Sequence, residues 1–393
     1  MARVKLEDVC ERGSSNLKQS DVVDKDGDYP IYGASGYIGN VDFYHQEQPY
    51  VAVVKDGAGI GRTTLHPAKS SVIGTMQYLL PKGNVLPEYL CYVVKYMHLE
   101  KYFTGATIPH IYFKDYKNEE FNLDSLDRQK EIVSTLNKIE KVIESRTKEL
   151  ELLDELIRAR FVELFGNPLD GTAKYPIHQV GEVANSVDPQ PSHRTPPVEE
   201  GGIPYVSIKD CDYKTGKIDF EGARKVSLKV LEEHMNRYTL HDGDFVVGKI
   251  GTIGNPVFVP VRNDYTLSAN VVLIQPNSEL VSPYFLKYSF ESDFVERQFA
   301  EAKNSTSQAA FGIQKVRTVE VMNPDLDVQR EFEIFVKQVD KSKFDIHKFL
   351  YCTSNNTQSI IKPRPNTKES GKTRGGNARI FWIERGQYQD VRI

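Results

Sequence analysis

Polar and aromatic side chains gather on loops of this sequence that are rich in glycine, proline or serine. In the first half these residues are Tyr32, Ser35, Tyr37, Lys55, Arg62, His110 and Lys114. In the second half they are Ser192, His193, Arg194, Lys209, Lys249, Asn255, Lys303, Ser307 and Gln308. Side chains of these types pair with base edges or phosphates, so the loops are candidates for nucleic-acid contacts. The alternative is that they are ordinary solvated loops with tyrosines packed at their feet.

Two glycine turns do not match the loops that bind nucleotides. "GAGIG" (Gly57 to Gly61) leads into the β-prone "RTTL", whereas a dinucleotide loop needs G-x-G-x-x-G opening a helix. "GKIGTIG" (Gly248 to Gly254) lacks the closing Gly-Lys-Ser/Thr of a phosphate loop. We also find no Asn-Pro-Pro-Tyr motif of an amino-methyltransferase, no nuclease set of carboxylates and lysine, and no histidine pair at ligand spacing. We therefore expect no catalysis, bound cofactor or metal site in this chain.

The composition sets further bounds on function. With 393 residues, two or three domains are expected, and the net charge of −4 means that any nucleic-acid site must be a local basic patch. The four cysteines have no CxxC spacing, which is typical of a reduced, cytoplasmic protein. The start "MARVKLEDVC" has no apolar signal region, and no apolar run approaches the roughly 18 residues of a membrane span.

A heptapeptide pattern that occurs twice indicates how the loops are positioned. "LDRQKEI" begins at Leu126 and "LDVQREF" begins at Leu326, 200 residues later. No glycine or proline interrupts 128–165, so we expect a helix of about 57 Å, with Asp127 as N-cap and Gly166 after its end. Its apolar residues keep a 4-3 spacing that is typical of a coiled-coil seam: Ile132, Leu136, Ile139, Ile143, Leu150, Leu153, Ile157 and Leu164.

The second copy predicts a second seam helix in the same chain. Phe332, Val336 and Val339 continue the 4-3 spacing, Lys343 occupies one slot, and the pattern is lost after Leu350. We expect this helix to be shortened to about 22 residues, or roughly 33 Å, and to pair antiparallel with the first.

The segments before the two helices share an order of elements. Each reads as strand, glycine-rich turn, strand and then an aromatic-rich helix that begins "PEYL" or "PYFL". We therefore predict an α/β (α+β) protein with two mixed α/β domains in a pseudo-twofold arrangement, separated by two long antiparallel coiled-coil helices. The expected parts are a first domain at 1–127, a spacer helix at 128–166, a second domain at 167–327, a shortened helix at 328–350 and a poorly ordered basic tail at 351–393.

The long helix ending "ARFVELFGNP", together with "YPIYGASGYIGNVDFY" and "GDFVVGKIGTIG", closely resembles the specificity (S) subunit of type I restriction–modification systems. The resemblance implies that each domain is a target recognition domain that reads one half of a split double-stranded DNA site. It implies that the helices hold two methyltransferase (M) subunits and that restriction (R) subunits join the complex. S-adenosylmethionine, ATP and Mg would then be bound by those partners, and this chain would be non-catalytic.

The resemblance leads to several expectations about binding. Two dissimilar readers predict a non-palindromic site with half-sites about 34 Å apart, or a multiple of that distance. Phosphate contacts dominate affinity, so we expect the isolated chain, at net charge −4, to bind DNA weakly and the assembled complex to bind it tightly. The competing interpretations are a coiled-coil scaffold that binds proteins and a self-sufficient methyltransferase or nuclease.

The last 43 residues depart from the family's pattern. They contain eight Lys or Arg against three Asp or Glu, and the only tryptophan, Trp382. Either a change of reading frame replaced the normal end of the helix, or the tail is a basic arm that touches DNA. Deletion of 352–393 separates the two hypotheses, because unchanged assembly and DNA binding would exclude the arm.

Overall fold

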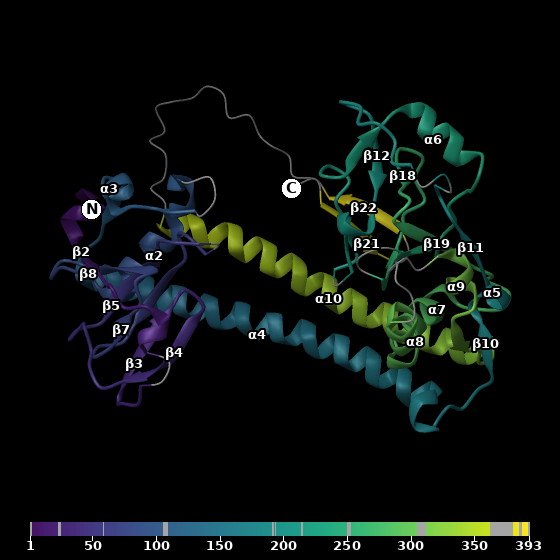
Figure 1. The fold of residues 1–393 in the computed structure, drawn as a ribbon, viewed down its shortest axis with the longest axis horizontal. Coiled ribbons are helices and arrows are strands. Elements are labelled where there is room, and N and C mark those ends of the chain that lie inside the picture. The colour runs from purple at the N-terminus through teal and green to yellow at the C-terminus, as the bar shows by residue number, and fades with distance from the viewer. Residues whose placement is uncertain are drawn as a thin grey trace. The chain divides into compact units, whose positions relative to one another are not determined.

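The computed structural model describes residues 2–391 except 23–24, 58, 105–108, 191, 193, 214, 250–252, 305–311, 362–379 and 385–386. For 303–304, 354–361 and 380–391 the backbone alone is described. The chain forms two compact units, one built from 1–147 with 348–372 and the other from 148–347 with 373–393. Each unit combines β-sheets with part of the two long helices (Figure 1).

Within the part of the chain that the structure describes, the first unit contains three small sheets. A four-stranded antiparallel sheet has the order β2-β8-β5-β6, a three-stranded sheet has the order β4-β3-β7 with β3 and β7 parallel, and β1 pairs with β9. The strands are β1 Ala2–Lys5, β2 Cys10–Ser14, β3 Tyr29–Gly33, β4 Gly36–Val41, β5 Tyr50–Val54, β6 Thr63–His66, β7 Ser71–Val72, β8 Met76–Pro81 and β9 Glu120–Leu123. The helices are α1 Leu6–Val9, α2 Pro87–Tyr96 and α3 Phe113–Tyr116.

The second unit repeats the topology of these three sheets and adds a two-stranded sheet, β13-β14. Its four-stranded sheet has the order β11-β19-β16-β17, its three-stranded sheet has the order β15-β12-β18 with β12 and β18 parallel, and β10 pairs with β20. The strands are β10 Ile177–Gln179, β11 Ala184–Val187, β12 Ile203–Val206, β13 Cys211–Asp212, β14 Lys217–Ile218, β15 Arg224–Val226, β16 Phe245–Gly248, β17 Gly254–Phe258, β18 Thr266–Leu267, β19 Val271–Pro276 and β20 Glu320–Met322. The helices are α5 Val180–Val183, α6 Leu228–Met235, α7 Pro283–Phe290, α8 Asp293–Asn304 and α9 Ile313–Arg317. The sequence repeat is therefore a repeat of the fold.

The first long helix, α4 (Leu126–Phe165), begins two residues before the predicted start. Ser125 caps it instead of Asp127, since the Arg128 amide lies 3.4 Å from the Ser125 hydroxyl and the Gln129 amide donates to the Ser125 carbonyl. Gly166 adopts φ 78° directly after the helix, as the predicted C-terminal glycine requires.

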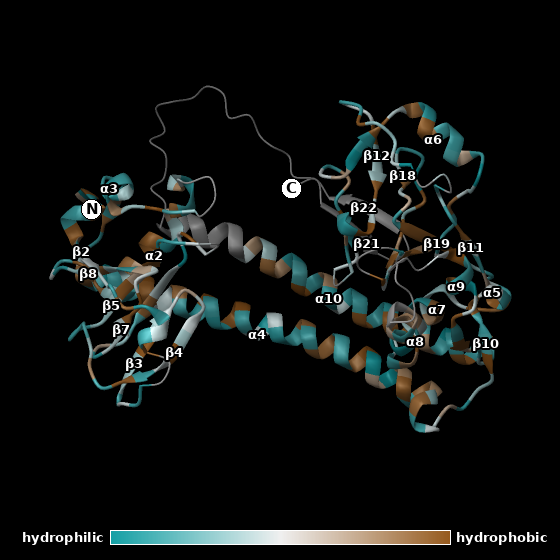
Figure 2. Ribbon diagram, in the orientation of Figure 1, coloured by the Kyte–Doolittle hydropathy of each residue, from teal (hydrophilic) through white to brown (hydrophobic). Residues whose placement is uncertain are grey.

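The seam residues of α4 have different surroundings along the helix. Ile132 and Leu136 are buried in the core of the first unit beside the aromatic-rich helix α2. Ile157 is buried in the core of the second unit, with Leu153 and Leu164 packed at its edge. Ile139, Ile143 and Leu150 are half-buried. Figure 2 shows hydrophobic patches recurring along α4 between hydrophilic stretches.

The second long helix, α10 (Leu326–Ile361), runs antiparallel to α4 within the second unit. Arg160 pairs with Glu331 at 2.6 Å, and Asp154, further back along α4, pairs with Lys343, further along α10, at 2.6 Å. Between these ion pairs lie the buried residues Ile157 of α4 and Phe332, Val336 and Val339 of α10. The antiparallel pairing predicted for the two helices is therefore present in this unit.

The predicted end of the second helix at Leu350 is wrong, because α10 continues to Ile361. A helix that loses its heptad pattern no longer has an apolar stripe to pack against another helix. Its backbone hydrogen bonds do not depend on that stripe, so the helix can continue. The first proline after Leu350 is Pro363, and a proline disfavours helix at the residue before it. Within the tail predicted to be poorly ordered, β21 (Ile380–Glu384) and β22 (Gln387–Val391) form an antiparallel hairpin.

The repeated glutamine of the heptapeptides explains why the pattern occurs twice. Gln129 has no exposed surface, and its Oε1 accepts a hydrogen bond of 2.8 Å from the amide of Leu86, which precedes α2. Its Nε2 donates to the carbonyls of Asn84 and Asp124 at 3.0 and 2.9 Å. One buried side chain thus hydrogen-bonds to three part-buried backbone groups and ties the long helix to the aromatic-rich helix.

Gln329 makes the same connection in the second unit. It is also fully buried, and its Oε1 accepts from the Ser282 amide at 2.7 Å, at the start of α7. Its Nε2 donates to the carbonyl of Pro324 at 2.6 Å and lies 3.4 Å from that of Leu280. Because buried backbone groups need partners, each glutamine fixes the phase of its long helix against its domain.

Replacement of Gln329 by leucine tests this role. The Gln329→Leu variant leaves buried backbone groups without partners, each at a cost of about 1–3 kcal/mol, so the free energy of unfolding should fall by at least that amount. Urea denaturation of the full chain measures it. The exposed Gln338→Leu on the same helix is the control and should change stability by less than about 0.5 kcal/mol. Equal stability of the two variants would contradict the proposed role.

Candidate nucleic-acid interface

Three loops of the first unit meet and bring most of its candidate residues onto one surface. They are the β3–β4 turn, the glycine turn between β5 and β6, and the segment at 109–114. The Arg62 guanidinium donates to the Ala34 carbonyl at 2.9 Å, which joins the first two loops. The Gly57 amide donates to the Pro109 carbonyl at 3.0 Å, which joins the second and third.

The glycine turn has the conformation that the sequence predicts. Gly57 has φ 89° and Gly61 has φ 81°, in the left-handed region that favours glycine. A Cβ at Gly61 would also lie 2.7 Å from the Glu100 amide nitrogen. The turn is therefore a hairpin connection that needs glycine for its backbone conformation at both positions and also for space at Gly61, and it leads into a strand instead of a helix.

Aromatic side chains form a stack beneath the β3–β4 turn. Tyr37 is 63% exposed, and its ring lies edge-on to Tyr32 with centroids 6.0 Å apart. Tyr32 packs on His66 at 4.4 Å, and His66 stacks on the buried Tyr50 at 5.3 Å. Ser35 is exposed at the turn itself. Because the half-buried Tyr32 rests on the buried His66 and Tyr50, Tyr37 is an exposed aromatic surface on a packed base, of the kind on which nucleic-acid bases stack.

Charged groups gather on the adjoining glycine turn and on the segment at 109–114. His110 Nδ1 lies 2.6 Å from Asp56 Oδ1, and Lys55 Nζ lies 4.0 Å from the same carboxylate. The exposed Lys114 ammonium lies 5.3 Å from the ring centroid of Tyr112, which stacks on His110. The cations can contact phosphates, and a carboxylate among them can accept a hydrogen bond from a base amino group.

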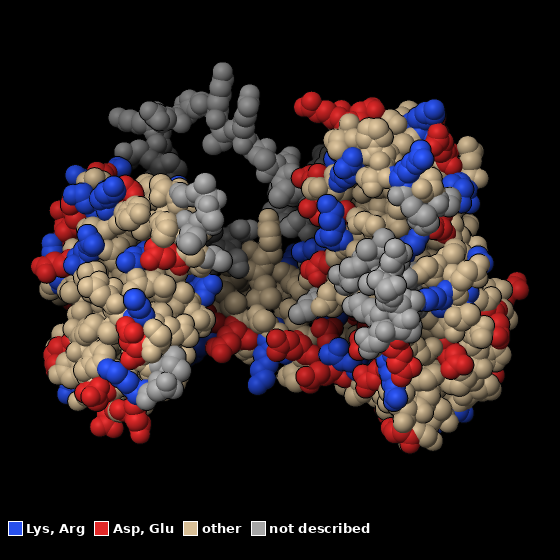
Figure 3. All heavy atoms as spheres, in the orientation of Figure 1, with Lys and Arg blue, Asp and Glu red and all other residues tan. Residues whose placement is uncertain are grey.

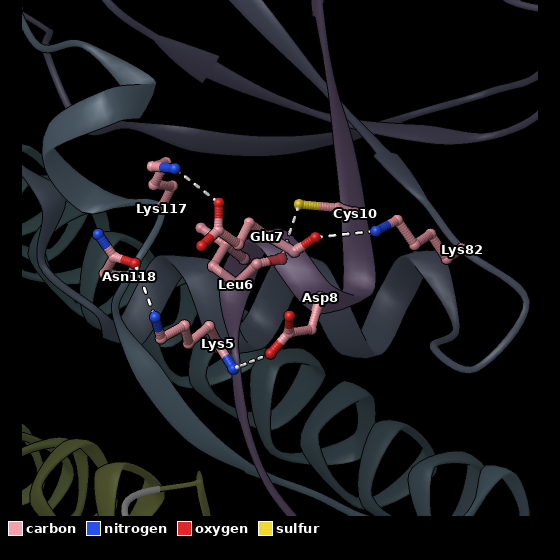
Figure 4. Close-up of polar contacts among 8 residues, drawn as sticks. All are labelled: Lys5, Leu6, Glu7, Asp8, Cys10, Lys82, Lys117 and Asn118. Carbon is pink, nitrogen blue, oxygen red and sulfur yellow. Dashed lines mark hydrogen bonds and ion pairs between the residues drawn. The ribbon is translucent and has the colours of Figure 1, made fainter.

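Residues 5–7 near the N-terminus hold the turn that follows the 109–114 segment. In Figure 4 the Lys117 ammonium contacts the Glu7 carboxylate at 2.8 Å, and the Lys82 ammonium donates to the Glu7 carbonyl at 2.8 Å. Lys5 Nζ donates to Asn118 Oδ1 at 3.1 Å. The contacts of Lys117 and Lys5 hold the turn at 117–119, between the 109–114 loop and the long helix, on β1 and α1, and the Lys82 contact ties α1 to the residue that follows β8.

The second unit brings fewer of its candidates together. Gln190 Nε2 donates to the Ser192 hydroxyl at 3.0 Å and to the Arg194 carbonyl at 3.1 Å, which orders these two exposed residues. Gln190 Oε1 lies 2.6 Å from His234 Nε2, so the loop is anchored to α6. Lys209 is exposed on a separate 3₁₀ turn at Ile208–Asp210. Asn255 adopts φ 35° at the start of β17.

The structure gives Lys249 a structural role instead of the predicted surface one. Its side chain is 6% exposed and its ammonium lies 2.8 Å from the Asp188 carboxylate. A charge this deeply buried needs a partner of opposite sign, and Asp188 supplies it. His193, Ser307 and Gln308 lie outside the described residues, and Lys303 is described by its backbone within α8 alone.

Sequence reasoning missed several residues of these surfaces. Asp56, Tyr112 and Gln190 touch predicted residues but were not predicted themselves. Asp56 directly follows Lys55 in "KDGAG", and an acidic neighbour on a predicted DNA loop is the signal that could have identified it. Nothing in the sequence near Gln190 indicates its contact with His234, 44 residues away.

The charge pattern is local and mixed. On the face drawn in Figure 3, basic and acidic side chains intermingle on both units, as the net charge of −4 leads one to expect. Among the described residues, no group of three or more His, Cys, Asp or Glu side chains is placed to hold a metal ion. No helix within the same part of the chain is long and apolar enough to cross a bilayer.

Burial lowers the pKa of His66 to about 4, which makes the first unit sensitive to acid. The unfolded histidine, with a pKa near 6.5, binds protons more readily, so stability is complete above pH 6.5 and falls as the pH drops towards 4. Between pH 7.5 and 5 we expect this residue to account for about 2 kcal/mol of lost stability. Urea denaturation of wild type and His66→Gln at both pH values measures it. Identical pH dependence of the two proteins would contradict the expectation.

Removal of one partner of the buried Lys249–Asp188 pair should destabilise the second unit. Lys249→Met leaves the Asp188 charge uncompensated, at a cost of about 3–5 kcal/mol, whereas Lys249→Met with Asp188→Leu should recover most of that loss. The exposed Lys209→Met is the control, with little effect on thermal unfolding. A Lys249→Met variant with normal stability and weakened DNA binding would contradict this structural role and indicate that Lys249 contacts DNA.

Comparisons with known proteins agree with the repeated fold. The family described as "Type I restriction modification DNA specificity domain" matches residues 1–155 and 174–351. The type I restriction enzyme MjaVIII specificity subunit of Methanocaldococcus jannaschii is 22% identical over 308 residues, which cover 74% of this chain and 72% of that protein.

Two solved structures share the fold. The S subunit of a type I restriction–modification system from M. genitalium has a TM-score of 0.54 at 14% identity, over 93% of this chain and 96% of that one. A chain from a study of complex assembly and conformational transition of the type I system has a TM-score of 0.51 at 12% identity, over 91% and 96%. Because the family match covers both repeats, this chain belongs to the type I restriction–modification DNA specificity family, the non-catalytic DNA-recognition subunits of these systems.

Proposed function

We propose that each of the two domains reads one half of a bipartite, asymmetric double-stranded DNA site. The observation that carries the proposal is the strand order, which is the same in both domains and therefore provides two similar frameworks for loops. The loops on these frameworks differ in sequence, so they present different side chains. Two domains that share a fold but present different side chains to DNA favour a site whose two halves differ in sequence.

One pair of equivalent lysines illustrates this divergence. The Lys55 amide donates to the Thr75 carbonyl after β5, and the Lys249 amide donates to the Asn270 carbonyl after β16. The two residues thus have the same place in the repeat. Lys55 is partly exposed beside His110 and Asp56, whereas Lys249 is buried against Asp188. Equivalent positions have taken different roles, and each domain then presents its own contact pattern.

We further propose that the long helices dock two methyltransferase subunits and that restriction subunits complete the assembly. On this proposal the partners bind S-adenosylmethionine, ATP and Mg, and this chain supplies the choice of sequence. The proposal also places the complex in the cytoplasm, where the four free cysteines stay reduced.

Substitution of Tyr37 tests the reading role of the first domain. Base stacking on an exposed aromatic ring is worth about 1–3 kcal/mol, so Tyr37→Ala should relax the choice of base at one or two positions. Tyr37→Phe keeps the ring and should preserve most of the discrimination. Methylation mapping of a host that expresses each variant with its methyltransferase measures the motif.

The expected motif has two unlike halves, and Tyr37→Ala should alter one half and leave the other unchanged. Leu169→Ala, at an exposed position outside the candidate loops and both long helices, is the control and should leave both halves unchanged. A palindromic wild-type motif, or a change of both halves by Tyr37→Ala, would contradict the proposed function.

A further inference from the structure

A basic groove lies where α2 begins against the first turns of α4. Its cavity volume is about 490 Å³, and its floor contains the apolar side chains of Leu86 and Val133. Lys130, Lys138 and Lys141 line it from α4, at a spacing that places them on one face of the helix. Glu88 of α2 is the one acidic residue in this lining, so the lysines outnumber the carboxylates three to one. Lys130 contacts Asp127 at 3.3 Å. Within the described part of the chain, no carboxylate is in ion-pair contact with Lys138 or Lys141.

The second unit has a cavity at the equivalent place. It lies where α7 begins against α10, and its lining includes Tyr284, Glu333 and Lys337. The offset of 200 residues relates Glu333 to Val133 of the first groove and Lys337 to the neighbouring Asn137. The glutamines that fix both long helices make the two junctions equivalent, since each ties the start of the aromatic-rich helix to its long helix.

The two cavities differ in charge and in space. The second has a volume of about 80 Å³. Lys337 pairs with Glu333 at 2.5 Å and lies 4.9 Å from the ring centroid of Tyr284, so its charge is already compensated. Glu333 also accepts a hydrogen bond from the Ser282 hydroxyl at 2.7 Å. The groove of the first unit is therefore the open and positively charged member of the pair.

We propose that the groove of the first unit binds an acidic segment of a methyltransferase subunit, and that it holds this subunit more tightly than the equivalent junction of the second unit holds another copy. The inference rests on the proposed function, because it needs two copies of one partner. Two copies of one protein dock most simply on equivalent surfaces, and the repeat supplies such surfaces. Uncompensated lysines favour carboxylates, and the apolar floor favours a peptide over a phosphate backbone.

Charge reversal in the groove tests the inference. Native mass spectrometry and light scattering of the full chain, titrated with the purified methyltransferase subunit, count the copies bound and measure both dissociation constants. Lys138→Glu with Lys141→Glu should raise the dissociation constant of the tighter association at least about tenfold and leave that of the weaker association unchanged. Lysine and glutamate are both good helix formers, so α4 should keep its fold, which circular dichroism checks.

The control carries the same charge change elsewhere on the first unit. Lys18→Glu with Lys25→Glu alters two exposed lysines outside the groove and should bind two methyltransferase subunits like wild type. Dissociation constants on the groove variant equal to those of wild type would overturn the inference and leave the proposed function intact. Full methyltransferase binding with lost DNA affinity would also overturn it, by assigning the groove to DNA. If wild type binds no methyltransferase, the proposed function itself fails and the inference with it.

Discussion

Two buried glutamines fix the geometry on which the rest of this protein depends. A long helix can pack on a domain in many rotational orientations. In the observed orientation, the side chains of Gln129 and Gln329 each hydrogen-bond to three backbone groups of the neighbouring segments. Their placement three residues before Ile132 and Phe332 sets which face of each helix enters the domain core. The repeated heptapeptide is therefore an anchoring device that also determines the direction of the coiled-coil seam.

The duplicated framework allows the two domains to diverge at their loops without loss of stability. Sheet order, parallel pairing and the glutamine anchor are the same in both units. Lys55 and Lys249 show what is free to change, since one is on a loop surface and the other neutralises a buried aspartate. The surfaces beside Gln129 and Gln329 have also diverged. The first unit has a lysine-lined groove there, whereas in the second unit Lys337 is paired with Glu333. Recognition and assembly can thus differ between halves that share a scaffold.

Local patterns allowed much of the fold to be predicted, while the candidate site depended on distant contacts. The periodicity of Ile132, Leu136 and Ile157 predicted α4, because helix phase is a local property. The end of α10 was predicted wrongly because the helix continues beyond the last residue of its 4-3 apolar pattern. Exposure of Tyr37 followed from its turn. The burial of Lys249 could not be foreseen, since its partner Asp188 is 61 residues away and no local signal links them.

Hydrogen exchange at the anchored amides tests the central claim most directly. The amides of Leu86 and Ser282 each donate to a buried glutamine. If these bonds hold the long helices to the domains, both amides should exchange only when their unit unfolds, with the same opening free energy as the core strands β5 and β16. Exchange of either amide through local opening, at a free energy well below that of the strands, would contradict the account.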